Sequence, residues 1–498
     1  MSDQISGSVA AEQVRILLDL NRIEDYRTFL KIKALPVYSF VGREAIIPRE
    51  YAARLGLVQD HAPSAPSELH PGLFDYQRDI SKLAIRKGKY AVFALPGLGK
   101  TLIMFEFARH AAAVLPPGRA VLIVSPLMVT QQTIGEAKRF YGDDLPIEPV
   151  RARDLPAWLE SGTAGIGITN YEAITDRVKA GRLGALILDE SSLLKSHYGK
   201  WGSRLIELGK GLRWKLCLTG TPAPNDRIEY ANHAVFLDQF PTVNSFLAKF
   251  FVNRGETCNR WELKAHALRP FYRDLSHWCI FLSNPAVYGW KDNTAPLPPI
   301  NTHIVEVGLT AKQRTDAMTV TGNLWGNPGG IGERGQVARI AKSGKKAAFV
   351  GKLIKESNGS CIAWCKYNAE QEELAALVPT AANISGDTPD DDRLTLIGQF
   401  QRGERQFLIS KPKIMGFGLN LQIARRMVFS TVQDSYEEYY QAVKRANRYG
   451  STHPLDVYIP VSDLERPMVE TVLRKAAMVQ SDTEEQEQLF KELAHAEL

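Results

Sequence analysis

The sequence predicts an α/β protein with two doubly wound parallel-sheet units in tandem. Three observations support this prediction. Apolar runs of strand length alternate with helix-like segments at the spacing of parallel sheets. Polar signatures follow directly on several of these runs, and the carboxyl ends of parallel strands are where such sheets bind ligands. With 498 residues, 44 % of them hydrophobic, the chain is long enough for about three globular domains.

The chain is organised around residues 91–101, AVFALPGLGKT. This pattern predicts a strand, a glycine turn and a helix start, which aim backbone N–H groups and the helix dipole at one point. Lys100 adds a positive charge for terminal phosphates, and Thr101 offers a hydroxyl to Mg²⁺. Taken alone, such a turn often only ends a strand. The predicted nucleotide-binding residues of this loop are Gly97, Leu98, Gly99, Lys100 and Thr101.

Two carboxylates end another predicted strand, LILDE, at residues 186–190. We expect Asp189 to hold Mg²⁺ through water, and Glu190 to polarise the water that attacks the γ-phosphate. The alternative, a helix cap with favourable charge, is less compatible with a phosphate loop in the same chain. Gln77 lies about 20 residues before that loop and carries an amide that can pair with an adenine edge, although such a residue alone is more often on the surface.

Composition limits the classes of function. The formal net charge of +6 weakly favours a polyanionic partner. The five cysteines include no CxxC pair, so no zinc ribbon is predicted, and Cys361 and Cys365 are expected to be buried apolar side chains. An odd cysteine count without a signal peptide indicates a reducing cytosol. No apolar run approaches the roughly 20 residues of a membrane span.

Four parts are expected along the chain. Basic and aromatic residues interleave near the N-terminus, either to grip nucleic acid or as a solvated basic face. In that region AEQVRILLDL has helical spacing, and FLKIKALPVYSFVGREAIIPREYAARLG contains strand-like runs. The tail is expected to be helical, to pack on the second sheet unit and to finish in a solvated end. The expected parts are an N-terminal accessory α+β domain (1–70), a first α/β domain (71–300) with a helical protrusion at about 230–300, a second α/β domain (301–462) and a C-terminal helical tail (463–498).

A helix is predicted over SYEEYYQAVKRANRYG, residues 435–450. Spacings of four and three residues would place Gln441, Arg445 and Arg448 on one helix face. These arginines can be ordinary surface charge. A planar, always-charged guanidinium is also what a developing phosphate charge requires.

Eight stretches, in order along the chain, resemble the motifs of superfamily 2 helicases. They are ALPGLGKT, LIVSPL, TNYE, LDESSLLK, LTGTPAPN, SGDT, GFGLNL and QAVKRANRYG. LFDYQ before the loop, together with the last motifs, resembles the Snf-type branch of DNA translocases over residues 70–460. The resemblance implies two RecA-like domains that bind ATP and Mg²⁺ in the cleft between them. By the family pattern Gln77 contacts adenine, and Arg445 and Arg448 reach the γ-phosphate.

The same resemblance assigns further residues. Thr219 and Thr221 would couple nucleotide to nucleic acid, and Gly418 and Asn420 would line the cleft from the second domain. The residues that fall on strand-contacting motifs are Ser125, Pro126, Thr169, Asn170 and Lys413.

The sequence also departs from the family pattern. Ser191 and Ser192 stand where many members have the end of DEAH or DEGH, so a histidine link to the coupling motif is missing. The last motif has Asn447 and Ser451 in place of the family's residues, and SYEEYY replaces a tryptophan-containing stretch. The protrusion is short and no chromatin-reader segment follows. These features favour a compact bacterial or phage-type translocase in the cytoplasm.

The favoured function is therefore a DNA-stimulated ATPase that tracks on duplex DNA, in repair, recombination or replication. A strand-separating helicase on DNA or RNA is the first alternative, and RNA is the less favoured partner. A nucleotide-gated binding module that does not hydrolyse ATP is the alternative from another class. Protein partners, oligomeric state and pathway are not predicted by the sequence.

Overall fold

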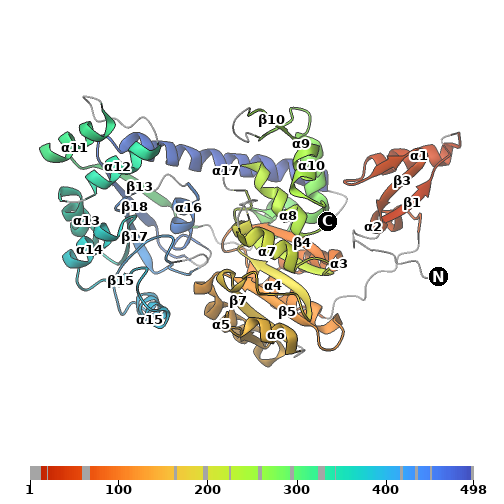
Figure 1. The fold of residues 1–498 in the computed structure, drawn as a ribbon, viewed down its shortest axis with the longest axis horizontal. Helices are drawn as coiled ribbons and strands as arrows, with labels where there is room; N and C mark the ends of the chain where they lie inside the picture. The colour runs from red at the N-terminus through yellow and green to blue at the C-terminus, as the bar shows by residue number, and fades with distance from the viewer. Residues whose placement is uncertain are drawn as a thin grey trace. The chain divides into compact units, whose positions relative to one another are not determined.

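The computed structural model describes residues 13–19, 21–58, 68–161, 165–194, 200–223, 226–255, 261–291, 297–322, 331–342, 344–415, 419–431, 436–448 and 451–494. Contacts divide the chain into two compact units. The first comprises residues 1–95, 99–293 and 484–498, and the second comprises residues 96–98 and 294–483 (Figure 1).

The first unit is built on a parallel sheet of seven described strands in the order β12-β4-β9-β8-β5-β7-β6. Strands β5 and β9 are buried along their whole length, as expected when helices cover both faces of a parallel sheet. The strands are β4 (Lys89–Ala94), β5 (Ala120–Ser125), β6 (Ile147–Pro149), β7 (Ile166–Asn170), β8 (Leu183–Asp189), β9 (Trp214–Thr219) and β12 (Cys279–Leu282).

Helices and 3-10 turns connect these strands. Helix α4 packs on β5, β8 and β9 and begins directly after the phosphate loop. The connecting helices are α3 (Asp75–Lys87), α4 (Lys100–Val114), α5 (Thr130–Tyr141), α6 (Leu155–Ser161), α7 (Lys200–Leu208) and α8 (Tyr230–Phe236). The 3-10 turns are η1 (Leu127–Val129), η2 (Gly142–Asp144), η3 (Tyr171–Ala173), η4 (Ser191–Leu194), η5 (Arg227–Glu229) and η6 (Pro285–Tyr288).

The predicted helical protrusion is only partly helical. It contains α9 (Val243–Phe250), the antiparallel pair β10 (Phe251–Asn253) and β11 (Trp261–Leu263), and α10 (Leu268–Trp278). The chain then returns to the sheet as β12, which pairs in parallel with β4. Aromatic rings of this region form core contacts, as expected: Phe271 lies 5.4 Å from Phe250, ring centroid to ring centroid, and both are buried.

The N-terminal part has its own small core and a three-stranded antiparallel sheet in the order β1-β3-β2. One local prediction is wrong here. AEQVRILLDL was expected to be helical, but β1 covers Gln13–Leu17, because its backbone pairs with β3 and Val14 and Ile16 alternate inward. The strand-like runs predicted in the following stretch are present as β2 and β3, although its first residues lie in α1. The elements are β1 (Gln13–Leu17), α1 (Ile23–Lys33), β2 (Ser39–Val41), β3 (Glu44–Pro48) and α2 (Arg49–Arg54).

Helix α2 joins this small domain to the rest of the first unit. Tyr51 Oη lies 2.7 Å from His277 Nδ1 of α10, and Lys87 Nζ donates to Glu50 at 2.7 Å. Hydrogen bonding to His277 and the charge of Lys87 outweigh burial and hold the pKa of Glu50 well below its usual range. The N-terminal domain is thus held by a small polar cluster as well as by its apolar contacts.

The second unit has a parallel sheet of six described strands in the order β13-β18-β17-β14-β16-β15. Figure 1 shows α13 and α14 on one side of this sheet and α16 on the other. Cys361 and Cys365 are buried in its core, as predicted. Both sheets confirm the predicted tandem α/β fold.

The strands of this unit are β13 (Ile300–Glu306), β14 (Ser360–Trp364), β15 (Ala382–Ile384), β16 (Phe407–Ser410), β17 (Ala424–Phe429) and β18 (Leu455–Val461). Its helices are α11 (Ala311–Thr321), α12 (Ile331–Ala341), α13 (Lys345–Lys355), α14 (Asn368–Leu377), α15 (Asp390–Gln401), α16 (Tyr436–Lys444) and the first part of α17 (Arg466–Ala494).

The tail is one long helix, as expected, but its last part is not a solvated end. Residues from Glu484 onward group with the first unit. There the buried Phe490 ring contacts Phe281 of β12 at 5.1 Å, and the backbone N–H of Ser283 donates to Glu487 at 2.8 Å. Within the described residues, no helix is both long and apolar enough to cross a membrane.

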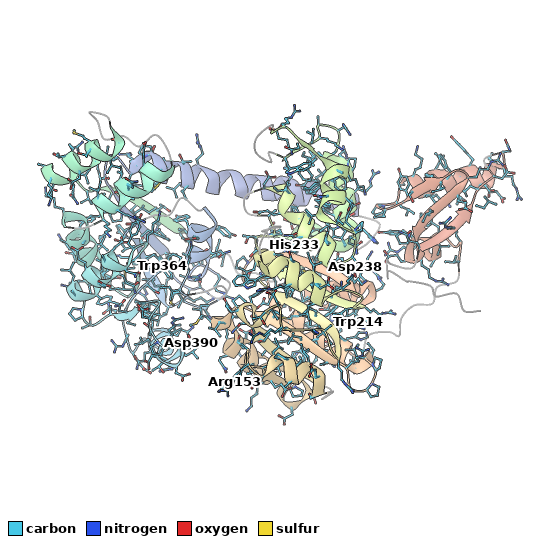
Figure 2. All side chains as sticks on the ribbon, viewed as in Figure 1. Arg153, Trp214, His233, Asp238, Trp364 and Asp390 are labelled. Carbon is cyan, nitrogen blue, oxygen red and sulfur yellow. The ribbon has the colours of Figure 1, made fainter. Side chains whose placement is uncertain are left out.

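One buried charge cluster of the first unit gives a stability prediction. Asp238 accepts from Lys89 at 2.7 Å and from the buried Lys215 at 2.8 Å, and burial lowers the pKa of Lys215 (Figure 2). Asp238→Asn keeps a residue that tolerates the local φ of 56° but leaves Lys215 without its counter-charge. We expect a loss of about 2–4 kcal/mol, measured by chemical unfolding of the full chain.

Asp390→Asn is the control for this prediction. That carboxylate is 63 % exposed and pairs with Arg393 at 3.4 Å, so the loss should stay below about 1 kcal/mol. Equal losses in the two variants would contradict the role of Asp238.

Candidate nucleotide-hydrolysis site

The phosphate loop lies between β4 and α4, as predicted. Gly97 and Gly99 have φ of 94° and 69°, a region that favours glycine. Lys100 Nζ donates to the carbonyl of Ala94 at 2.7 Å, and Thr101 lies in the first turn of α4, half-buried. The Lys100 ammonium group therefore has a hydrogen-bond partner within its own loop, and a bound anion would replace that partner.

Gln77 packs against this loop. It is 3 % exposed, and its Oε1 accepts from the Phe74 backbone N–H at 3.0 Å. A Cβ added to Gly99 would lie 2.1 Å from Gln77 Nε2, so only glycine fits at that position. The predicted adenine contact and the predicted phosphate loop are therefore neighbours within the structure.

Asp189 and Glu190 end β8, beside β5 and β9. Asp189 accepts from Ser125 Oγ at 2.9 Å, and Glu190 accepts from Thr219 Oγ1 at 3.2 Å. Burial and the charge of Glu190 raise the pKa of Asp189 to about 6, while Ser125 and Lys100 act in the opposite direction. The two adjacent carboxylates lie near one lysine, and a further cation would stabilise their charged forms.

Glu190 has an unusual backbone. Its φ is 52°, in the left-handed region that non-glycine residues seldom adopt. Such strain persists where surrounding contacts fix it, and it is concentrated at functional sites. Thr219 links Glu190 to the coupling segment, because its Oγ1 also accepts from the Thr221 backbone N–H at 3.2 Å.

The residues present fit a Mg²⁺–nucleotide complex. The glycine loop leaves no room for a side chain at Gly99, and hard oxygen donors of Asp189 and Thr101 are of the type Mg²⁺ prefers. Among the described residues no group of three or more His, Cys, Asp or Glu side chains could hold a metal on its own.

Sequence reasoning missed three residues that hold the carboxylate pair. Tyr171 Oη donates to the Asp189 carbonyl at 2.7 Å, and burial raises its pKa. His233 of α8 lies 3.0 Å from Ser191 Oγ, and Asn232 donates to the Leu194 carbonyl. Tyr171 belongs to the quoted TNYE stretch, whereas no sequence signal marked the two α8 residues.

The predicted nucleic-acid residues of the first unit lie at the carboxyl ends of β5 and β7. Thr169 is 2 % exposed and donates to the Val150 carbonyl at 2.8 Å, so its hydroxyl is used within the fold. Asn170 caps η3 by accepting from the Ala173 N–H, and Ser125 holds Asp189. Pro126 follows β5 and is buried.

In the second unit the predicted arginine helix is shorter than expected. Helix α16 ends at Lys444, so Arg445 and Arg448 lie in the following turn and not on one helix face with Gln441. The turn arises because the Arg445 carbonyl accepts from Leu421 N–H at 2.9 Å, and Arg448 N–H donates to Ser451 Oγ at 3.0 Å.

Arg445 has contacts within its own unit. It is 4 % exposed, its guanidinium lies 5.4 Å from the Trp364 ring centre, and it donates to the Pro412 carbonyl at 3.2 Å. Arg448 is half-buried.

The other predicted residues of this unit are placed as follows. Asn420 Oδ1 accepts from the Gln422 N–H at 3.2 Å, and the Asn420 carbonyl accepts from Gln401 at 2.7 Å. Lys413 is exposed and pairs with Glu438 at 3.3 Å. Gly418 lies outside the described residues.

One parallel sheet presents a glycine phosphate loop after β4 and an Asp-Glu pair after β8, with β9 between these strands, and a second parallel-sheet unit follows. This arrangement defines a helicase-type nucleotide hydrolase. The SNF2-related domain family matches residues 94–316, and the helicase conserved C-terminal domain family matches residues 345–450. The chain belongs to the Snf-type branch of the superfamily 2 helicases, and it is an ATP-hydrolysing enzyme.

Similar proteins come from a phage and from mammals. Protein p41 of Acyrthosiphon pisum secondary endosymbiont phage 1 is 26 % identical over 405 residues, which cover 71 % of this chain and 84 % of that protein. The DNA annealing helicase and endonuclease ZRANB3 of Mus musculus is 22 % identical over 448 residues, which cover 84 % of this chain but only 41 % of that protein.

One solved structure that is similar is the Sulfolobus solfataricus SWI2/SNF2 ATPase core in complex with dsDNA. It is 18 % identical, with a TM-score of 0.39, and the match covers 87 % of this chain and 97 % of that one.

Proposed function

We propose that the chain is an ATP-driven translocase that tracks on duplex DNA, with ATP bound as its Mg²⁺ complex. The names of the relatives support DNA as the partner, since the ZRANB3 protein is a DNA annealing helicase. Membership in an ATP-hydrolysing family argues against a module that binds nucleotide without hydrolysing it. Strand separation remains the alternative activity on the same partner.

In the proposed reaction, Glu190 accepts a proton from the attacking water while Lys100 binds the terminal phosphates. Bound Mg²⁺ would supply charge neutralisation on the phosphate oxygens. Asp189 and Thr101 would hold the ion, and Gln77 would contact adenine. Gly418 and Asn420 are proposed as further cofactor-binding residues. The proposed arginine contacts to the γ-phosphate come from Arg445 and Arg448, with Gln441 as a neighbour in the same segment.

One observation carries the nucleic-acid part of the proposal. Three cations of the second unit surround one aromatic ring: Arg339, Lys342 and Lys366 lie 5.3, 4.9 and 5.7 Å from the centre of Tyr367. Among the described residues none of the three forms an ion pair with a carboxylate. Like charges gathered without ion pairs of their own favour an anionic ligand such as a phosphodiester backbone.

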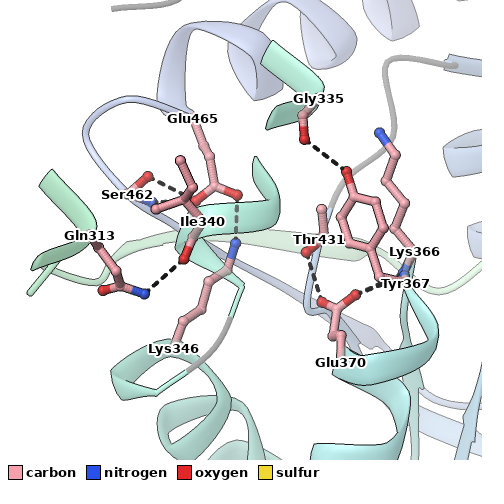
Figure 3. Close-up of polar contacts among 10 residues, drawn as sticks. All are labelled: Gln313, Gly335, Ile340, Lys346, Lys366, Tyr367, Glu370, Thr431, Ser462 and Glu465. Carbon is pink, nitrogen blue, oxygen red and sulfur yellow. Dashed lines mark hydrogen bonds and ion pairs between the residues drawn. The ribbon is translucent and has the colours of Figure 1, made fainter. Parts of the chain in front are cut away.

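The ring that gathers these cations is held in place from several sides (Figure 3). Tyr367 Oη donates to the Gly335 carbonyl at 3.1 Å. The backbone N–H groups of Lys366 and Tyr367 both donate to the buried Glu370, which also accepts from Thr431 at 2.7 Å. The ring at the centre of the cluster is therefore fixed by the fold.

The test of the proposed function is ATPase rate against nucleic-acid cofactors. We expect duplex DNA to stimulate hydrolysis more than single-stranded DNA or RNA. No stimulation by duplex DNA would contradict the translocase. A forked duplex that is unwound with ATP would favour the strand-separating alternative.

Removing the three cations should weaken duplex binding. In the variant R339A/K342A/K366A we expect the slope of log K against log salt to fall by up to about 3, because each phosphate contact contributes about 0.9. Fluorescence anisotropy with a labelled duplex, at several salt concentrations, measures this slope.

The control replaces three exposed cations that do have carboxylate partners. Arg153, Lys210 and Lys352 pair with Asp154, Glu207 and Glu356. Their triple alanine variant should leave the slope unchanged. An equal change in both variants would show that bulk charge, and not the Tyr367 cluster, binds the duplex.

A further inference from the structure

Helix α8 holds both ends of the turn that follows the catalytic carboxylate. His233 Nε2 lies 3.0 Å from Ser191 Oγ, and the neighbouring Asn232 donates to the Leu194 carbonyl. Ser191 and Leu194 are the first and last residues of η4, and all four residues are buried, at 0–2 % exposure. Two consecutive residues of one helix thus fix the turn that begins immediately after Glu190.

His233 is itself fixed on its other side. Its ring meets the edge of Phe93 at 5.2 Å between ring centres, with the planes at 82°. Phe93 belongs to β4, which leads into the phosphate loop, and in the sheet it lies in register with Thr219, the residue that donates to Glu190. Burial lowers the pKa of His233 to about 4, so the ring is neutral at pH 7 and has one donor and one acceptor nitrogen.

We propose that His233 is a positioning residue for ATP hydrolysis, which acts through Ser191 to hold Glu190 in its left-handed backbone conformation. At a φ of 52°, Glu190 requires support from its neighbours, and Ser191 is the next residue in the chain. The histidine that many family members carry two positions after the glutamate is absent, because Ser192 stands there. In this chain a histidine of α8 contacts Ser191 instead.

The contact joins two buried polar side chains, and a leucine at position 233 would remove one of the partners of Ser191 Oγ. Ser191 Oγ also hydrogen-bonds the Cys217 thiol of β9, so the serine joins η4 to the strand that carries Thr219. Loss of the imidazole would free the turn to rotate. A displacement of the general base by about 1 Å can lower a rate about 100-fold without altering substrate binding.

The experiment measures steady-state ATPase and nucleotide affinity in the full chain. We expect His233→Leu to lower kcat about 10- to 100-fold while KM for ATP and the affinity for a fluorescent ATP analogue change less than about 2-fold. His233→Gln, which keeps a polar group near the position of Nε2, should retain kcat within about 5-fold.

His110→Leu is the matched control. His110 is also buried, at 3 %, and its ring meets Trp214, which is labelled in Figure 2, at 5.2 Å between ring centres. It lies near the far end of α4 from the phosphate loop. The two leucine variants should lose similar stability, whereas only His233→Leu should lose kcat. Equal kcat values in the two variants would overturn the proposal.

Ser191→Ala removes the same hydrogen bond from the turn side and serves if His233→Leu does not fold. We expect Ser191→Ala to lower kcat with unchanged KM, and the double variant to be no slower than the slower single variant, because both act through one contact. Additive losses, or a full kcat in Ser191→Ala, would contradict the proposal. The test rests on ATP hydrolysis alone, so its outcome is independent of whether duplex DNA is the partner.

Discussion

Glu190→Gln is expected to lower kcat for ATP hydrolysis about 1,000-fold while ATP still binds. The substitution removes the proton acceptor but keeps the side-chain length and an oxygen that can accept from Thr219 Oγ1, now at 3.2 Å. The left-handed backbone at this position is strained equally for both residues, so the fold should be unaffected. Single-turnover ATPase together with equilibrium binding of a fluorescent ATP analogue measures the two effects separately.

The control for Glu190→Gln is Glu172→Gln. Glu172 lies in η3, which follows β7, the next strand but one from β8 in the sheet, and its side chain is exposed. The Glu172→Gln variant should hydrolyse ATP at the normal rate. If Glu190→Gln retained more than about a tenth of the normal kcat, another residue would have to activate the water, and the assignment of Glu190 would fail.

The parts of the fold that the sequence predicted are those in which local pattern and tertiary environment agree. Strands such as β5 and β9 are buried along their whole length and mostly apolar, and each is followed by its polar signature. The phosphate loop and the carboxylate pair belong to this class. Their positions follow from the rule that parallel strands end at one sheet edge.

The errors occurred where tertiary contacts decide. β1 was predicted to be helical because the spacing of its apolar residues fits both the helix period and the strand period. Its pairing with β3 makes this segment a strand. The arginine helix was extended past Lys444 because nothing local signals that Leu421 would bind the Arg445 carbonyl. His233 could not be found because it meets Ser191 across 42 positions of sequence.

Gly99→Ala is expected to lower kcat/KM for ATP at least about 100-fold, mainly through a higher KM. Two costs combine at this residue. Its φ of 69° costs alanine about 1–2 kcal/mol, and the added Cβ would lie 2.1 Å from Gln77 Nε2. Gln77 is buried and hydrogen-bonded to Phe74, so it has little room to move, and the loop that must receive phosphate moves instead.

Gly211→Ala separates the two costs. Gly211 has a φ of 77° and no atom within 4 Å of an added Cβ, so it carries the backbone strain without the collision. Its ATPase should stay normal at a similar loss of stability. The double variant G99A/Q77A removes the colliding amide and should recover ATP affinity towards that of Gln77→Ala alone. If Gly99→Ala behaved like Gly211→Ala, or if the double variant recovered nothing, the contact between Gln77 and the phosphate loop would not control nucleotide binding, and the adenine role proposed for Gln77 would lose its structural support.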